Sequence, residues 1–86
     1  MYYVYVLQSE DKRTYVGYTS NLEARLAYHN TNHSGHTGKG KWECVYYEAY
    51  KDERDARRRE RAIKNSSNAK RWLKKRIQNS LDSENS

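Results

Sequence analysis

Three short segments that favour β-strands constrain this chain more than any other feature of its sequence. Residues 2–8, 14–19 and 42–50 are rich in tyrosine and valine, which pack well on a pleated sheet. A polar stretch joins the first two segments and is long enough for a hairpin loop. Because a chain of 86 residues can build only one core, the three segments are expected to share one sheet.

A helix is predicted directly after the second strand. Ser20 and Glu23 have the spacing of a capping box, so the helix should begin there and run to about residue 30. One face of this helix carries Leu22, Leu26 and His29. The stretch 31–41 that follows holds three of the four glycines and is expected to be a mobile surface loop.

Two more helices are predicted after the third strand. Asp52 should cap a helix over residues 53–64, and a break at residues 65–67 should start a last helix that ends near residue 78. The buried stripe of that last helix is expected to be Ala69, Trp72, Leu73 and Ile77. The order ββαβαα predicts an α+β fold in which helices flank a three-stranded antiparallel sheet. We expect one domain over residues 1–79 and a flexible tail over residues 80–86.

Positive charge is concentrated in the second half of the chain. Lys and Arg number 17 against 11 Asp and Glu, a net charge of +6, and residues 51–76 alone hold twelve basic and four acidic residues. This asymmetry favours a polyanionic partner, because basic contacts with phosphates release counterions. The residues expected to contact nucleic acid are Arg25, Lys39, Lys41, Arg57, Arg58, Lys64, Lys70 and Arg71.

Several other classes of protein are disfavoured by the sequence. No apolar run reaches the roughly 18–20 residues of a membrane span, and no signal-peptide pattern opens the chain. Cys44 is the only cysteine, so no disulfide partner is expected and a cytoplasmic location is predicted. The spacing of the remaining possible zinc ligands is too loose to favour a zinc site; they are His29, His33, His36 and Cys44.

Glu60 lies where an amphipathic helix would place an apolar residue. On a helical wheel it falls within about 60° of Ala56 and Ile63. A carboxylate in that position costs free energy unless a cation or a metal ion pairs with it. The simpler alternative is an ion pair with Arg57, Arg59 or Arg61. Because those arginines can reach solvent, we favour a functional role for the carboxylate.

The N-terminal elements supply four further candidates. Arg25 and His29 are one helical turn apart, so both can act on the same group. Tyr5 and Tyr15 lie on the first two predicted strands, where tyrosine also packs well. Gly17 interrupts the second strand, which indicates a bulge or the close approach of a ligand or of backbone.

Taken in chain order, these motifs resemble the GIY-YIG nuclease superfamily, and most closely its small stand-alone bacterial members. Tyr3 stands where the signature has its first glycine. The matching segments span about residues 2–77 and are Tyr3-Val4-Tyr5, Tyr15-Val16-Gly17, Asn21-Leu22-x-x-Arg25-Leu26-x-x-His29-Asn30, Trp42-x-x-Val45-Tyr46-Tyr47-Glu48 and Ala56-Arg57-x-x-Glu60-x-x-Ile63-Lys64.

The resemblance implies an endonuclease that hydrolyses DNA phosphodiester bonds with one Mg²⁺ or Mn²⁺ ion, in DNA repair or recombination. It makes Glu60 the metal ligand and Arg25 a phosphate clamp. Tyr5 is expected to be the general base, with its pKa lowered by Arg25 and the metal, while Tyr15 and His29 position groups or relay the proton. Recognition of DNA structure rather than of sequence is expected, since no second module is visible.

Two alternatives remain open. The first is a domain of the same fold that binds nucleic acid with little or no catalysis, with Tyr18 or Tyr28 stacked on unpaired bases. The second is an adaptor whose basic helices bind an acidic protein. Metal-dependent product formation separates an enzyme from the first alternative, and salt-dependent affinity for polyanions addresses the second.

Overall fold

The fold is built on a sheet of three antiparallel strands. The computed structural model describes residues 1–31 and 41–82, in which β1 (Tyr2–Ser9), β2 (Thr14–Thr19) and β3 (Trp42–Tyr50) form a sheet with the order β2-β1-β3. The two later strands have the predicted bounds, and the first is one residue longer. The predicted α+β fold with a three-stranded antiparallel sheet is confirmed.

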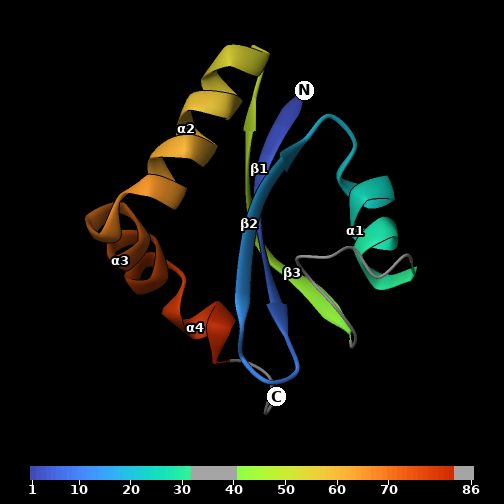
Figure 1. Ribbon diagram of the computed structural model, residues 1–86, viewed down its shortest axis with the longest axis vertical. Coiled ribbons are helices and arrows are strands. Elements are labelled where there is room, and N and C mark those ends of the chain that lie inside the picture. The colour runs from blue at the N-terminus through green and yellow to red at the C-terminus, as the bar shows by residue number, and fades with distance from the viewer. Residues whose placement is uncertain (32–40, 83–86) are drawn as a thin grey trace.

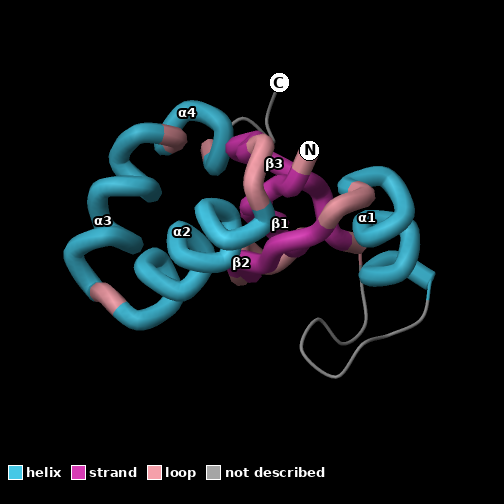
Figure 2. Tube along the Cα trace, turned by 90° about the horizontal axis from the view of Figure 1, so that it is seen from above, coloured by secondary structure: helices cyan, strands magenta, loops and turns pink. Residues whose placement is uncertain are grey.

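Helices cover both faces of this sheet. The helix α1 (Leu22–Thr31) lies on one face, and α2 (Glu53–Asn65), α3 (Ser67–Arg76) and α4 (Gln78–Leu81) lie on the other. Figure 1 looks toward strand β2, with α1 to the right of the sheet and the other helices to the left. The view from above shows the same three layers (Figure 2). Strand β2 is an edge of this sheet, with one helical layer on each side of it.

The central strand β1 divides the core into two clusters. Its alternate side chains point to opposite faces, so Val4 and Val6 pack with α2 and α3, whereas Tyr5 and Leu7 pack on the side of α1. All four are almost completely buried. A strand that is buried on both faces explains why residues 2–8 read as a nearly continuous apolar run.

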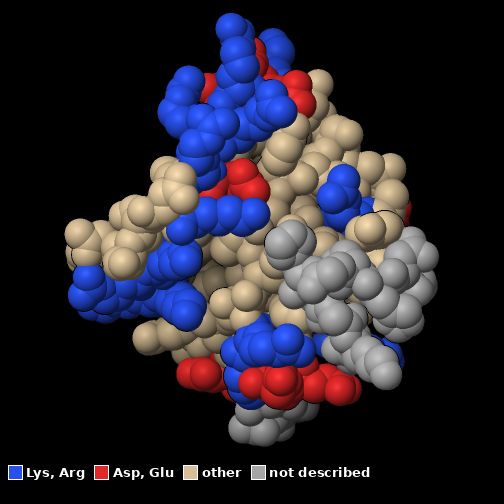
Figure 3. Space-filling view, viewed as in Figure 1, with Lys and Arg blue, Asp and Glu red and all other residues tan. Residues whose placement is uncertain are grey.

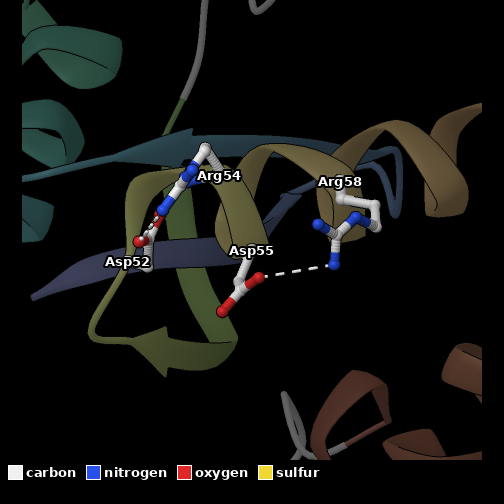
Figure 4. Close-up of polar contacts among 4 residues, drawn as sticks. All are labelled: Asp52, Arg54, Asp55 and Arg58. Carbon is white, nitrogen blue, oxygen red and sulfur yellow. Dashed lines mark hydrogen bonds and ion pairs between the residues drawn. The ribbon is translucent and has the colours of Figure 1, made fainter.

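The helix α2 begins where the sequence predicts. The Asp52 carboxylate accepts a hydrogen bond from the backbone N–H of Arg54 at 2.8 Å, which satisfies one of the free donors at the helix start. Asp52 also pairs with the Arg54 guanidinium at 2.8 Å, and Arg58 donates to Asp55 at 3.3 Å one turn on (Figure 4). The hydrogen bonds from Arg54 lower the pKa of Asp52 to about 2.

The cap of α1 differs from the prediction by one residue. The Asn21 side chain, not that of Ser20, accepts the hydrogen bond from the backbone N–H of Ala24 at 3.0 Å. The Thr19 hydroxyl in turn accepts from the backbone N–H of Asn21 at 3.1 Å. The predicted capping box at Ser20 is therefore wrong. Asparagine is as good an N-cap as serine, so sequence alone could not choose between these two neighbours.

The C-terminal helix is two helices rather than one. Ile77 leaves helical geometry, with φ of −111° and ψ of 23°, and separates α3 from α4. Leu81, which falls in the segment expected to be a tail, packs against the core cluster of Val4 and Ile63. Residues 83–86 of the expected tail lie outside the described residues.

Trp72 does not belong to the buried stripe of α3. Its exposed fraction is 69%, whereas Leu73 and Ile77 are buried at 4% and 6%. The prediction that Trp72 packs inward is wrong because the helix turns Leu73 directly toward the sheet, which leaves the neighbouring residue on its flank. The Lys75 ammonium lies 5.7 Å from the centre of the Trp72 ring.

Within residues 1–31 and 41–82, the helices are too short or too polar to cross a bilayer.

Candidate active site

Gly17 lets the side chain of Tyr5 pass directly over the backbone of β2. The two residues face each other across the β1–β2 ladder. A Cβ atom on Gly17 would lie 2.5 Å from the Tyr5 hydroxyl oxygen, 2.7 Å from the ring carbon that bears it, and 3.1 Å from a ring carbon of Tyr15. These distances are too short for non-bonded atoms. The close approach at Gly17 is therefore made by the side chain of Tyr5, whereas the sequence predicted a bulge, a ligand or backbone there.

Three predicted site residues meet at this point. The Tyr5 hydroxyl oxygen lies 3.1 Å from Nε2 of His29, within hydrogen-bonding distance, and both side chains are buried. The Tyr15 ring lies 5.0 Å from the His29 ring and 6.3 Å from the Tyr5 ring, between centroids. These residues come from β1, β2 and α1 and are here called the aromatic cluster (Tyr5, Tyr15 and His29). Tyr15 is the more exposed of the two phenols.

Burial determines the protonation of Tyr5. Removal from solvent raises the pKa of the Tyr5 phenol above its ordinary value, and the nearby Tyr15 raises it further. The charge of Arg25 lowers this pKa, but by less than burial raises it, and the charge of Glu60 raises it. The protein surroundings of Tyr5 therefore raise its pKa overall, although Arg25 acts in the predicted direction. Both charges nevertheless act on the pKa of this phenol.

Lys64 contacts both Glu60 and a ring of the aromatic cluster. Its carboxylate lies 2.9 Å from Nζ of Lys64, one turn further along α2, and its side chain is 21% exposed. The same Lys64 Nζ lies 5.4 Å from the centre of the Tyr15 ring. The helix α2 thus brings a carboxylate and an ammonium group to the β2 edge, beside Tyr15.

The arginines that could have neutralised Glu60 have other partners or face solvent. Arg59 makes a two-pronged ion pair with Glu48, at 3.0 Å from Nε to Oε1 and 3.0 Å from its terminal nitrogen to Oε2. Arg57 lies over the Tyr18 ring at 5.7 Å, and Arg61 is exposed. The alternative prediction named an arginine, whereas the ion pair that Glu60 makes in the structure is with Lys64. That pair is partly exposed, so Glu60 is accessible to solvent.

Glu48 forms a second charged centre that is not among the residues predicted from the sequence. Besides Arg59, its carboxylate accepts hydrogen bonds from the hydroxyl groups of Tyr46, at 2.6 Å, and Tyr50. The three residues 46, 48 and 50 alternate along β3 and so share one face of the sheet, which is the signal that could have found them. Burial raises the pKa of Glu48, but its hydrogen bonds outweigh burial, so the net pKa is lowered. Burial and Glu48 raise the pKa of Tyr50 to about 12.

This network predicts acid-sensitive stability. The folded-state pKa of Glu48 is lowered, so above its unfolded-state pKa the carboxylate contributes fully to the free energy of unfolding. This contribution is lost as the pH falls through the folded-state pKa of Glu48. We expect Glu48→Gln to lower the free energy of unfolding by about 1–3 kcal/mol at pH 7, and by much less at pH 3. Urea unfolding followed by circular dichroism at both pH values measures this. Glu43→Gln, an exposed change on the same strand, is the control; an equal loss at both pH values would contradict the prediction.

The residues predicted to contact nucleic acid lie on two sides of the site. Figure 3 shows basic side chains gathered over α2 and α3, beside the β2 edge. On the other side, the Arg25 guanidinium lies 5.9 Å from the centre of the Tyr28 ring. Lys39 lies outside the described residues. The others have exposed positions: Lys41, Arg57, Arg58, Lys64, Lys70 and Arg71.

The donor atoms at the site fit a hard divalent cation. Glu60 offers carboxylate oxygens, and Mg²⁺ or Mn²⁺ needs only one or two carboxylates because it keeps several waters and takes further oxygens from phosphate. In the part of the chain that the structure describes, no three His, Cys, Asp or Glu side chains group together as metal ligands. Of the residues considered for zinc, His33 and His36 lie outside that part.

Comparison with known proteins gives one consistent result. The family model described as the GIY-YIG catalytic domain matches residues 1–77. The UPF0213 protein CPE1444 of Clostridium perfringens is 39% identical over 66 residues, which are 74% of this chain and 71% of that protein. The UPF0213 protein SH2523 of Staphylococcus haemolyticus is 38% identical over 77% of this chain and 83% of its own. The solution NMR structure of the UPF0213 protein BH0048 from Bacillus halodurans is 31% identical, covers 85% of this chain and 82% of its own, and superposes with a TM-score of 0.54.

Proposed function

The chain belongs to the GIY-YIG nuclease family, and on that premise we propose that it is an endonuclease that hydrolyses DNA phosphodiester bonds with one Mg²⁺ or Mn²⁺ ion. The observation that carries the proposal is the meeting of Tyr5, Tyr15 and His29 over Gly17, with Glu60 at the same strand edge. We propose a role in DNA repair or recombination, with DNA recognised by its structure, because the basic side chains over α2 and α3 suit contacts with backbone phosphates, which carry no sequence information.

Glu60 is the residue that would hold the ion. A bound divalent ion supplies positive charge to the phosphoryl oxygen and to the oxygen that leaves. In the structure, Glu60 pairs with Lys64 at 2.9 Å. When Glu60 takes a different partner, Lys64 is free to contact the phosphate, since its ammonium group already lies beside Tyr15.

Arg25 would bind the phosphate from the side of α1. Its guanidinium is exposed, carries a positive charge, and matches the geometry of phosphate oxygens. Its charge also acts on the pKa of Tyr5, which supports a role beside the reacting groups. Arg25 and Lys64 thus approach the phosphate from opposite layers of the fold and fix its orientation.

Tyr5 would pass a proton rather than act as a free phenolate. Its raised pKa keeps the phenol protonated near neutral pH. In the proposed step, the phenol oxygen takes a proton from the attacking water while its own proton moves along the 3.1 Å contact to Nε2 of His29. The resulting hydroxide would form the new bond to phosphorus, the bond to the leaving 3′ oxygen would break, and that oxygen would take up a proton from solvent water. Tyr15, which lies next to His29 and Lys64, would position the water.

The proposal predicts that loss of one hydroxyl oxygen abolishes most of the activity. We expect Tyr5→Phe to lower the rate of cleavage of end-labelled DNA by about 10²–10⁴-fold, because the relay loses its central oxygen. The measurement is gel-resolved cleavage of single-stranded and duplex DNA in Mg²⁺, Mn²⁺ or EDTA. Tyr47→Phe, the same change at an exposed tyrosine on β3, is the matched control. Equal rates for the two variants would contradict the relay.

A binding module of the same fold is the second candidate function. The Glu60–Lys64 ion pair supports it, because the lysine competes with a metal ion for the carboxylate. Such a module would bind DNA through the basic surface of α2 and α3 and form no product. Cleavage that depends on a divalent ion therefore decides between the two functions, whereas DNA binding alone does not.

A further inference from the structure

A cleft with a volume of about 250 Å³ opens beside the candidate active site. It lies between the first half of β2 and the layer formed by α2, α3 and α4, and Tyr15 forms part of its wall. Its floor is apolar and includes Val16, Ile63 and Leu73. The cleft therefore continues the reactive edge of the sheet into a hollow lined by core side chains.

The rim of this cleft is basic. Lys64 comes from α2, and Lys70 and Lys74 come from α3. Lys64 also lies over the Tyr15 ring. Among the described residues that line the cleft, none is acidic. The cleft thus combines an apolar floor, an aromatic wall and a rim of ammonium groups. This combination suits a planar, weakly polar group that is bonded to a negatively charged group.

We propose that this cleft binds an unpaired nucleotide of the DNA strand next to the bond that is cut. The base would enter the apolar floor against Tyr15, and Lys70 and Lys74 would hold the adjacent phosphates. A base inside an intact duplex would first have to unpair and unstack, which costs free energy that an unpaired base does not need. This inference rests on the proposed nuclease function and adds a substrate class to it: DNA with at least one unpaired base.

The opposite flank of α3 offers a contrast on the same helix. The exposed Trp72 lines a second hollow there, together with Lys75 and Arg76. That hollow shares Leu73 with the cleft but none of the aromatic cluster. Bases bound there would not lie beside Tyr15. Basic residues of α3 that do not line the cleft therefore provide matched controls for those that do.

The test compares two DNA duplexes that differ only in one base. One carries a single bulged adenosine, and the other carries an abasic site at the same bulge, so that length, shape and phosphate number are equal. Fluorescence anisotropy in EDTA measures affinity without cleavage. We expect the wild type to bind the base-containing bulge roughly tenfold more tightly than the abasic one, as burial of one base against an aromatic ring implies. Equal affinities would overturn the proposal.

Two pairs of charge reversals assign that preference to the cleft. Lys70→Glu with Lys74→Glu should remove the preference, whereas Arg71→Glu with Lys75→Glu, which changes the same net charge on the same helix, should keep it while weakening both affinities. All four lysines and arginines are exposed, so the fold should tolerate the changes. If both pairs remove the preference equally, or only the second pair does, the cleft is not the binding site.

A variant that fills the cleft tests the same point without changing charge. Thr14 is exposed and lines the cleft, so Thr14→Trp should block it and remove the preference. Ala49→Trp, at an exposed position of the other edge strand, should not. Preference without any cleavage would refute the nuclease function and leave the cleft in place. Cleavage with no preference for the base would support the nuclease function and refute the binding of a base in the cleft.

Discussion

Glu60→Gln should abolish metal-dependent cleavage while leaving the fold almost unchanged. The substitution keeps the size of the side chain but removes the negative charge that a divalent ion requires. We expect the rate to fall by at least about 100-fold, as it does when a major electrostatic stabiliser of a transition state is removed. The cost in stability should be small, because the only ion pair lost in the described structure is the partly exposed contact with Lys64. Such a pair contributes about 0.3–0.5 kcal/mol.

This contrast between activity and stability is what identifies a functional carboxylate. The matched control is Glu53→Gln, the same change at an exposed position of the same helix. Single-turnover cleavage and urea unfolding are measured on all three proteins. If Glu60→Gln cleaves like the control, Glu60 does not hold the ion. If it instead loses several kcal/mol of stability, the carboxylate serves the fold.

Gly17→Ala should disrupt both the fold and the activity. The added Cβ would lie 2.5 Å from the Tyr5 oxygen, and the Tyr5 ring is buried and cannot move aside without disturbing its contact with His29. We expect the free energy of unfolding to fall by about 1–3 kcal/mol, which is the usual cost of adding a methyl group to a filled interior. Cleavage should fall with it, because the displaced phenol no longer lies against Nε2 of His29.

A double-mutant cycle shows whether the clash with Tyr5 is the cause. Tyr5→Phe removes the oxygen that makes the closest contact, so Gly17→Ala should cost less stability in the Tyr5→Phe protein than in the wild type. Part of the cost should persist, because the ring carbon still lies 2.7 Å from the new atom. Thermal or urea unfolding of the four proteins gives the coupling energy. Equal costs in both backgrounds, or no cost at all, would contradict the packing described for Gly17.

The elements of the fold were predictable because their signals are local. Alternation of tyrosine and valine marks the strands, and Asp52 marks the start of α2. The meeting of Tyr5 and Tyr15 follows from the hairpin, which places β1 and β2 side by side. Which side chains of a helix are buried depends on packing and is harder to predict from the sequence. Trp72 and Leu73 are adjacent apolar residues, and only contact with the sheet decides which of them is buried.

The charged centres show the same limit. Glu60 stands out in the sequence, but its pairing with Lys64 rather than an arginine depends on Glu48, which binds Arg59 from β3. The raised pKa of Tyr5 depends on its burial between the sheet and α1, which no spacing of residues reveals. Sequence identifies the residue types of the site, whereas the three-dimensional packing decides how their protons and charges are arranged.

The central claim is that one ion at Glu60, working with the aromatic cluster, cleaves DNA. Its most direct test is the initial rate of cleavage of end-labelled DNA by the purified wild-type chain as Mn²⁺ is raised from zero in metal-free buffer. The account predicts no product without metal and a hyperbolic rise that saturates with a Hill coefficient of about one, as binding of a single ion requires. Intact DNA at every Mn²⁺ concentration, with binding still visible by anisotropy, would contradict it.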